Sequence, residues 1–268
     1  AIEIEFMMKK YGRAPKLAII LVGDDPASVQ YVNSKKKSCS AIGIDCDLHI
    51  LPNSIRQEEL IKVIEGLNQD DTIDAILVQL PVPKHIDRNA ILSAIDYRKD
   101  VDGLHPMNVG LLNSSQKGVI PCTPRGIISL LKEEGIEITG KHCVVIGRSN
   151  LVGKPMAQLM LNENASVTIC HSKTRDLAAL TRQAEILIIA IGCPNLVTAE
   201  MLKEGAVVID VGINNVDGKL VGDIYNSIDV SGIEKKAAAI SPVPGGVGPM
   251  TIASLLQNTV DLYKMHIQ

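Results

Sequence analysis

Four polar side chains in the first half of the sequence stand where catalysis explains them better than packing does. Tyr31 and Lys35 are four residues apart in a helix-like stretch, so they share one helix face. Gln79 interrupts the apolar run DAILVQL just before Pro81, and Asp102 follows in KDVDGLHPMNVG. Because the sites of α/β proteins form at strand ends, these residues are candidates for acid–base and hydrogen-bonding roles.

Each of these residues also has an ordinary structural interpretation. Tyr31 and Lys35 suit a solvated helix face, Gln79 a hydrogen-bonded edge residue, and Asp102 a turn former before a glycine. The Tyr-x-x-x-Lys spacing also marks short-chain dehydrogenases, but there the pair follows the cofactor loop, and here it precedes the glycine-rich turn. The stretch from Asp100 to Asp102 lacks the third ligand and the later Glu of a calcium loop, so we expect no metal site.

The stretch VVIGRSNLVGKPMAQLML is typical of a phosphate-binding turn between a strand and a helix. The strand ends at Gly147, and Pro155 suits the first helical turn. With small residues at Gly147, Ser149 and Gly153, a pyrophosphate could approach the backbone N–H groups of the helix start. The spacing fits neither the NTPase loop nor the hydrolase elbow, and it is a longer relative of the dinucleotide fingerprint. A tight turn without a ligand is the alternative.

The residues after the next strand, SVTIC, favour NADP over NAD. An Asp or Glu there would receive the ribose hydroxyls of NAD, but the sequence continues with HSKTR. Ser172 in that segment and Arg148 in the glycine turn offer donors that suit a 2'-phosphate. A solvated group of cations at a strand end is the alternative.

Strand-like and helical stretches alternate along the chain, which predicts an α/β fold. Apolar runs such as KLAIILVG, ILIIAIG and AVVIDVG are typical of parallel strands covered by helices on both faces. A boundary is expected around GVIPCTPRG, where prolines punctuate a loop. We therefore expect two domains, each a mainly parallel sheet covered by helices. The first holds residues 1–122 plus 250–268, and the second, residues 123–249, is a Rossmann-type nucleotide-binding domain.

Composition excludes several other classes of protein. The net charge of -3 over 268 residues gives no reason to expect a nucleic-acid partner. The six cysteines contain no C-x-x-C pair, which indicates reduced thiols and a cytosolic setting. No apolar run approaches the ~20 residues of a membrane span. The opening residues read as the middle of a helix, so we expect further residues ahead of Ala1 in the natural protein.

Six motifs, taken in order, resemble those of one enzyme family: YVNSK, VQLPVPKH, KDVDGLHPMNVG, PCTPRG, GRSNLVGKP and SPVPGGVGPMT. From about Pro15 onward the sequence resembles the methylenetetrahydrofolate dehydrogenase/cyclohydrolase family. The resemblance implies NADP-dependent oxidation of 5,10-methylenetetrahydrofolate and hydrolysis of the methenyl product to 10-formyltetrahydrofolate, in one-carbon metabolism and purine biosynthesis. It also implies a cytoplasmic homodimer and a folate site in a cleft between the two domains.

The resemblance further implies a role for each candidate residue. Lys35 corresponds to the acid/base of hydrolysis, Gln79 to its hydrogen-bonding partner, and Tyr31 to the ring that packs on the pterin. Asp102 corresponds to the carboxylate that grips the amino-pyrimidine edge of the pterin. The catalytic candidates are therefore Tyr31, Lys35 and Gln79, and the substrate-binding candidates are Tyr31, Asp102, Gly245, Gly246 and Pro249. The cofactor-binding candidates are Gly147, Arg148, Ser149, Gly153, Ser172 and Ile213.

Two alternatives remain open at this stage. The same fold could retain only the dehydrogenase or only the cyclohydrolase activity. A nucleotide-sensing module without turnover is less favoured, because Lys35, Gln79 and Asp102 would then have no role.

Overall fold

The protein, as a computed structural model, falls into two compact units. The structure describes residues 2–216, 218–224 and 230–267. Unit 1 comprises Ala1–Cys122 with Ser254–Gln268, and unit 2 comprises Thr123–Ala253. Residues 250–253, which the sequence analysis assigned to the first domain, belong to unit 2, where Met250 lies against Gly126.

The sheet of unit 1 is parallel and has the strand order β2-β1-β3. Its members are β1 (Lys16–Val22), β2 (Asp45–Leu51) and β3 (Ala75–Val78). A parallel bridge between Ile76 and Asp100 extends the edge beyond β3. The chain next to Asp100 is thereby aligned with the carboxyl end of β3.

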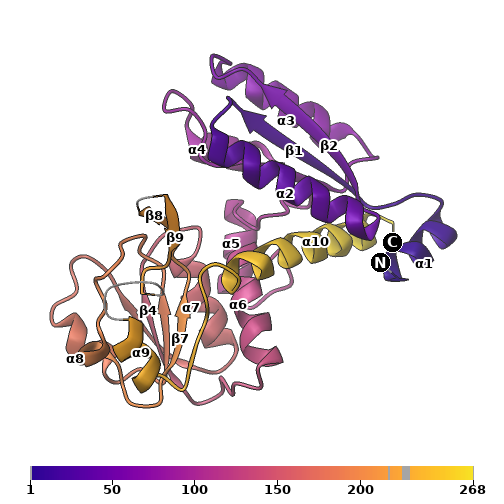
Figure 1. Ribbon diagram of the computed structural model, residues 1–268. Coiled ribbons are helices and arrows are strands. Elements are labelled where there is room, and N and C mark those ends of the chain that lie inside the picture. Colours follow the sequence, from indigo (N-terminus) through magenta and orange to yellow (C-terminus); the bar gives the residue numbers. More distant parts are fainter. Residues whose placement is uncertain (1, 217, 225–229, 268) are drawn as a thin grey trace. The chain divides into compact units, whose positions relative to one another are not determined.

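Helices cover both faces of this sheet. Side chains from alternate β1 positions pack into two separate apolar clusters: Leu17 and Ile19 join one, and Ala18 and Ile20 join the other. The first cluster includes residues of α1 (Ile2–Tyr11), α2 (Pro26–Ile42) and α10 (Val247–His266), and the second includes residues of α3 (Gln57–Gln69) and α4 (Arg88–Ala94). Figure 1 shows α2 and α3 on opposite sides of β1 and β2. Because both faces are covered, β1 is apolar at every position after Lys16.

Unit 2 contains a five-stranded parallel sheet with the order β10-β7-β6-β4-β5. Its strands are β4 (His142–Ile146), β5 (Ser166–Cys170), β6 (Ile186–Ile189), β7 (Val207–Asp210) and β10 (Ala239–Ile240). Numbered along the chain and read from β5, the order is 2-1-3-4-5, so the direction of winding reverses between β4 and β6. Ligands of doubly wound sheets bind at the carboxyl ends of the strands at such a reversal.

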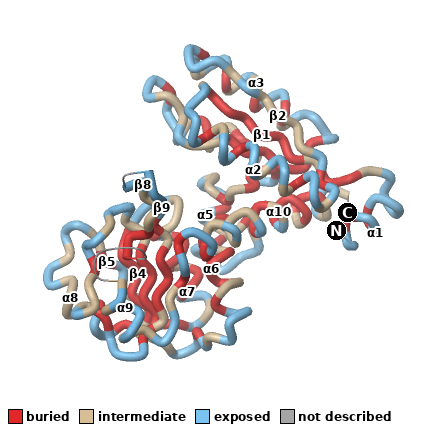
Figure 2. Tube along the Cα trace, in the orientation of Figure 1, coloured by how far each residue is buried: buried red, intermediate tan, exposed pale blue. Residues whose placement is uncertain are grey.

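Helix α5 (Pro106–Asn113) belongs to unit 1. The other elements of unit 2 are α6 (Cys122–Glu133), α7 (Gly153–Asn162), α8 (Leu177–Thr181), η1 (Ala199–Met201), α9 (Val230–Lys236) and the antiparallel ribbon of β8 (Asn214–Val216) with β9 (Lys219–Val221). Figure 2 shows the buried residues concentrated along the strands of each unit. The predicted fold class is confirmed: both units have parallel sheets covered by helices, and the second is of the Rossmann type.

In the part of the chain that the structure describes, no helix is long and apolar enough to cross a membrane. Among the same residues, no group of three or more His, Cys, Asp or Glu side chains is arranged to hold a metal ion.

Candidate active site

Helix α2 presents Tyr31 and Lys35 one turn apart. The helix starts after Asp25, whose carboxylate accepts a hydrogen bond from Ser28 N at 2.9 Å, and it ends at Gly43, which has a left-handed φ of 86°. Tyr31 is 47% exposed, whereas Lys35 is partly buried. The tyrosine face is therefore open to a ligand, and the lysine beside it is sheltered.

Lys35 is bound to Gln79, as the sequence analysis expected of catalytic partners. Lys35 Nζ donates to Gln79 Oε1 at 2.9 Å. The backbone N–H of Gln79 donates to Ile20 O at 2.8 Å, and its side-chain Nε2 donates to Leu80 O at 2.7 Å. Because Nε2 of Gln79 donates to the carbonyl of Leu80, Oε1 is left to face the amine of Lys35. The end of β3 thus fixes both the place and the orientation of Gln79.

Asp102 and Cys122 lie close to Lys35 in unit 1. Burial first, and then the negative charge of Asp102, raise the pKa of the Cys122 thiol well above its usual value, while the charge of Lys35 acts in the opposite direction. Gly103, at φ 66°, lets the chain after Asp102 pass close to the segment that begins at Val119. A Cβ on Gly103 would lie 2.8 Å from Val119 O, which is too close. The structure therefore gathers a lysine, an amide, a carboxylate and a thiol at one end of the unit 1 sheet.

Cys122 is a neighbour of this group that sequence reasoning missed. The sequence indicates only that its thiol is reduced, and the PCTPRG motif does not reveal its contacts. The thiol donates to Val101 O at 3.4 Å and is buried. It thereby packs directly under the segment that carries Asp102.

In unit 2, the turn after β4 is built around Gly147. Its φ is 123°, and a Cβ at this position would overlap the carbonyl oxygen of Ala190, which follows β6. A Cβ on Gly153, the first residue of α7, would overlap the carbonyl oxygen of Gly147. Both glycines are therefore required for β4, α7 and the loop after β6 to approach each other.

The start of α7 differs from the expectation in one respect. The glycine-rich turn predicts that the N–H groups of the first turn are open to a pyrophosphate. In the structure Ser149 Oγ accepts hydrogen bonds from Val152 N at 3.1 Å and Gly153 N at 3.3 Å, and Ser149 O accepts from Lys154 N at 3.0 Å. Ser149 is a helix cap here, because the hydroxyl satisfies N–H groups that the helix itself cannot.

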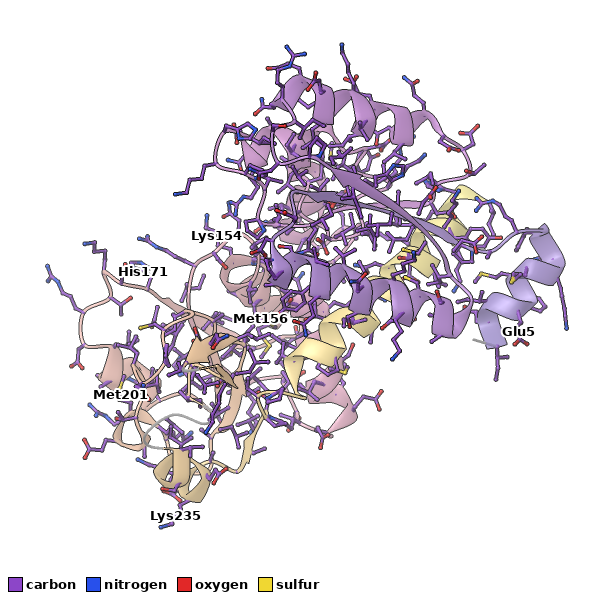
Figure 3. All side chains as sticks on the ribbon, turned by 45° about the horizontal axis from the view of Figure 1, so that its top comes forward. Glu5, Lys154, Met156, His171, Met201 and Lys235 are labelled. Atoms are coloured by element: carbon purple, nitrogen blue, oxygen red, sulfur yellow. The ribbon has the colours of Figure 1, made fainter. Side chains whose placement is uncertain are left out.

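Arg148 and Ser172 follow neighbouring strands at the same edge of the sheet. Ile146 of β4 is paired with Cys170 of β5, and each candidate lies two residues beyond its member of this pair. Both side chains are exposed. Figure 3 shows His171, directly after β5, and Lys154 of α7 at one end of unit 2, and Lys235 at the other. The structure thus brings the two predicted 2'-phosphate contacts to one place.

The remaining candidates also belong to unit 2. Ile213 lies between β7 and β8 and is 49% exposed. Gly245, at φ 108°, and Gly246, whose N–H donates to Pro242 O at 2.9 Å, form the turn before α10, and Pro249 is in the first turn of that helix. The three predicted substrate contacts of this turn are therefore in a different unit from the candidates of α2.

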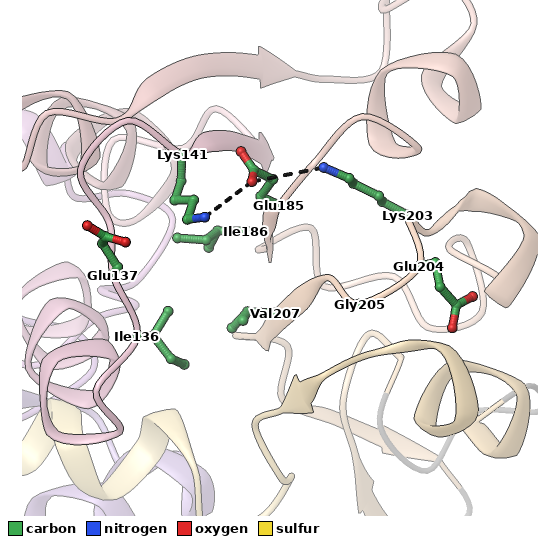
Figure 4. Close-up of a pocket in the computed structure, with 9 residues that line it drawn as sticks. All are labelled: Ile136, Glu137, Lys141, Glu185, Ile186, Lys203, Glu204, Gly205 and Val207. Carbon is green, nitrogen blue, oxygen red and sulfur yellow. Dashed lines mark hydrogen bonds and ion pairs between the residues drawn. The ribbon is translucent and has the colours of Figure 1, made fainter.

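One cavity of unit 2 lies away from all of these residues. It has a volume of ≈ 430 Å³ and opens at the amino-terminal edge of the sheet, where β6 and β7 begin. Figure 4 shows Glu185 between Lys141 at 3.4 Å and Lys203 at 4.0 Å, above Ile186 and Val207. Since nucleotide sites of such sheets form at the opposite edge, this cavity is not the predicted cofactor site.

Comparison with known proteins covers both units. Residues 1–102 match the catalytic domain, and residues 121–267 the NAD(P)-binding domain, of tetrahydrofolate dehydrogenase/cyclohydrolase. The chain is 54% identical over 250 residues to the bifunctional protein FolD of Exiguobacterium sibiricum, an alignment that covers 93% of this chain and 89% of that protein.

Two solved structures have the same fold over almost the whole chain. The bifunctional FolD methylenetetrahydrofolate dehydrogenase/cyclohydrolase of Campylobacter jejuni matches with a TM-score of 0.94 and 50% identity, covering 98% of this chain and 93% of that one. The methylenetetrahydrofolate dehydrogenase-cyclohydrolase of Trypanosoma brucei, complexed with NADP cofactor and an inhibitor, matches with a TM-score of 0.93 and 40% identity, covering 100% and 93%.

Proposed function

Because this chain belongs to the tetrahydrofolate dehydrogenase/cyclohydrolase family, we propose that unit 1 supplies its folate chemistry and unit 2 its NADP site. The protein is a bifunctional enzyme. It oxidises 5,10-methylenetetrahydrofolate to the methenyl form with NADP, and it hydrolyses the methenyl form to 10-formyltetrahydrofolate. The observation that carries the residue assignment is the 2.9 Å hydrogen bond between Lys35 and Gln79.

The oxidation step needs positioning more than acid–base help. Removing a hydride from the N–CH₂–N carbon leaves a cation that both nitrogens share, so no proton has to move. A bound NADP would supply the hydride acceptor for this step. Tyr31 offers an exposed ring for the pterin face, and Asp102 offers two carboxylate oxygens for parallel N–H donors on the pterin edge.

The hydrolysis step needs a group that both accepts and returns a proton. Water adds to the methenyl carbon and loses one proton to the amine of Lys35, which leaves a hydroxyl group on that carbon. The amine then delivers this proton to the leaving nitrogen as the C–N bond breaks, and the hydroxyl proton passes to solvent as the formyl C=O forms. Gln79 is uncharged and accepts through Oε1, so it can hold the amine in either protonation state. Lysine amines in partly desolvated sites are well suited to this exchange.

Unit 2 binds NADP at the carboxyl ends of β4 and β5. Arg148 and Ser172 are proposed as the contacts of the 2'-phosphate, because both are exposed donors at this edge. Gly147, Ser149 and Gly153 shape the turn at which the pyrophosphate would lie, with Ile213 beyond it. Gly245, Gly246 and Pro249 are proposed to lie beside the nicotinamide and the folate. A cytoplasmic homodimer is the proposed state of the enzyme.

An absorbance assay tests the function directly. Protein mixed with 5,10-methylenetetrahydrofolate and NADP should produce the methenyl chromophore, which should then decay faster than in protein-free buffer. Formation without accelerated decay would reduce the enzyme to a dehydrogenase, and decay of added methenyl substrate without formation would reduce it to a cyclohydrolase. Either result would contradict the proposed pair of activities, and absence of both would overturn the proposed function altogether. The same assay with NAD should run more slowly.

A further inference from the structure

The loop after β6 is held by one buried carboxylate, that of Asp223, which has no exposed surface. Asp223 Oδ2 accepts hydrogen bonds from Ile191 N at 2.9 Å and Gly192 N at 3.1 Å, and Oδ1 accepts from Cys193 N at 2.9 Å. Consecutive backbone N–H groups that converge in this way form an anion-binding nest. In this protein the anion in the nest is one of its own side chains.

Asp223 also ties the loop after β7 to the loop after β6. Its Oδ1 accepts from Asn214 Nδ2 at 3.0 Å, and its backbone carbonyl accepts from Asn195 N at 3.0 Å. Its backbone N–H donates to Asp210 Oδ1 at 2.9 Å, at the end of β7. Among the described residues, the four donors to the Asp223 carboxylate are uncharged amides. Burying a carboxylate against neutral donors is unfavourable unless the hydrogen bonds are complete, so its geometry is tightly determined.

The backbone at two glycines lies directly against the carboxylates of Asp223 and Asp210. A Cβ on Gly212 would overlap the carboxyl group of Asp223, and a Cβ on Gly222 would overlap Oδ2 of Asp210. Asp210 also accepts from Gly212 N at 3.0 Å and Ile224 N at 2.9 Å. The ends of β6 and β7 are therefore fixed to each other through two side chains.

This arrangement lies at the winding reversal of the sheet, beside the predicted pyrophosphate turn. Ala190, the residue before the nest, is in contact range of Gly147, since its carbonyl oxygen would overlap a Cβ there. Arg148 and Ser172 stand on the β5 side of this turn and are proposed to take the 2'-phosphate. The adenosine half of NADP then lies on the β5 side, and the nicotinamide half extends over the ends of β6 and β7.

We propose that Asp223 is a positioning residue that fixes the loop after β6 for the nicotinamide half of NADP. The inference rests on the proposed function of unit 2. Asp223 acts through the backbone of Ile191, Gly192 and Cys193 and does not itself touch the cofactor. Its removal should therefore impair binding of the whole dinucleotide while sparing a fragment that ends at the adenosine half.

The test compares two ligands in the variant Asp223→Asn. The amide has the volume of the carboxyl group, but its NH₂ would point at N–H donors of the nest. The dissociation constant of NADP should rise about tenfold, the effect expected from one lost hydrogen bond to a charged group. The dissociation constant of adenosine 2',5'-bisphosphate, which lacks the nicotinamide half, should change by less than about twofold. The cyclohydrolase rate should be retained, because Lys35 and Gln79 belong to unit 1.

Glu185→Gln is the matched control. Glu185 is also a unit 2 carboxylate that accepts a backbone hydrogen bond, from His142 N at 3.0 Å, but it lies at the opposite edge of the sheet. This variant should bind both ligands as the parent does. Equal weakening of NADP and of the bisphosphate in Asp223→Asn would show general loosening of unit 2 and overturn the proposal, as would unchanged NADP binding. Failure of the parent protein to bind NADP would instead refute the proposed function.

If Asp223→Asn does not fold, a milder variant tests the same proposal. Asn214→Ala removes one of the four donors and leaves the backbone nest and the carboxylate in place. It should weaken NADP binding by a smaller factor with the same sparing of the bisphosphate. Amide hydrogen exchange at residues 191–193 should be faster than in the parent. Unchanged exchange together with unchanged NADP binding in Asn214→Ala would contradict the proposal.

Discussion

Lys35 differs from the two lysines that follow it in having a fixed partner. Lys36 and Lys37 are exposed, whereas Lys35 is partly buried and donates to Gln79. An amine in water samples many rotamers, and a hydrogen bond to an amide whose own orientation is fixed reduces them to one. The site therefore distinguishes one lysine in a run of three by its contacts.

The first prediction is that Lys35→Met separates the two activities. Methionine keeps most of the side-chain length but cannot carry a proton, so hydrolysis of the methenyl form should fall by at least about a hundredfold, as for loss of a general acid–base group. NADP binding should be unchanged. The measurements are the decay of the methenyl chromophore and an NADP titration, with Lys36→Met as the control. Hydrolysis at the parent rate in Lys35→Met would remove the catalytic assignment.

The second prediction concerns the choice between the two dinucleotides. Arg148→Ala removes a proposed charged contact of the 2'-phosphate, a group that NAD lacks. The KM for NADP should therefore rise about tenfold or more, and the KM for NAD should stay within about threefold. Steady-state dehydrogenase assays with each cofactor measure the ratio. Parallel increases in the two KM values would show that Arg148 acts on a part shared by both dinucleotides.

At the scale of elements, the position of the pyrophosphate turn depends on how closely β4, α7 and the loop after β6 approach. Gly147 stands where all three meet, and its φ of 123° is a conformation that residues with side chains avoid. Side chains of β4 on one face are buried with residues of α8 and α9, so the strand cannot retreat without opening that cluster. Packing on the sheet therefore determines how closely β4, α7 and the loop after β6 approach each other. Gly147 permits this approach because it has no side chain.

The third prediction is that Gly147→Ala damages this turn more than backbone strain alone would. Strain at a positive φ costs about 1–3 kcal/mol, and the overlap with Ala190 O adds to it. NADP affinity should fall by more than about tenfold. Gly205→Ala is the control, because Gly205 also has a positive φ, 74°, but nothing within 4 Å of its added Cβ. Equal losses of NADP affinity in the two variants would show that close approach at Gly147 is unimportant.

Much of this architecture could be predicted from local sequence, and the rest depends on distant partners. Apolar runs indicated the parallel strands, and the polar interruption at Gln79 indicated a strand end with a site. Periodicity could not reveal that Asp223 binds N–H groups some thirty residues earlier, because the two segments meet only after the sheet forms. The cap made by Ser149 was missed for a related reason: its hydroxyl could face a ligand or its own helix, and the sequence favours neither.

For the whole molecule, the important fact is that unit 1 is discontinuous in the chain. Its first segment ends at Cys122, and its second begins within α10, after all of unit 2. Asn258 of α10 is buried and donates through Nδ2 to Val101 O at 2.8 Å and to Ile120 O at 2.9 Å. One amide group from the end of the chain thus joins the segment before Asp102 to the segment before Cys122.

The last prediction follows from the two hydrogen bonds that Asn258 donates. Asn258→Ala leaves the buried carbonyl of Val101 and the partly buried carbonyl of Ile120 without this donor, so unit 1 should lose about 2–4 kcal/mol of unfolding free energy. Val101 directly precedes Asp102, and the KM for the folate substrate should therefore rise while the dissociation constant of NADP stays constant. Calorimetric unfolding and the two titrations measure these effects. Gln257→Ala is the control on the same helix, because Gln257 is exposed and its side-chain amide donates to Asp261 one turn later. The stability of this variant should stay within about 0.5 kcal/mol of the parent. If Asn258→Ala were as stable as this control, or if it weakened NADP binding and folate binding alike, the prediction would be contradicted. The end of the chain would then have no specific role in holding the segment that carries Asp102.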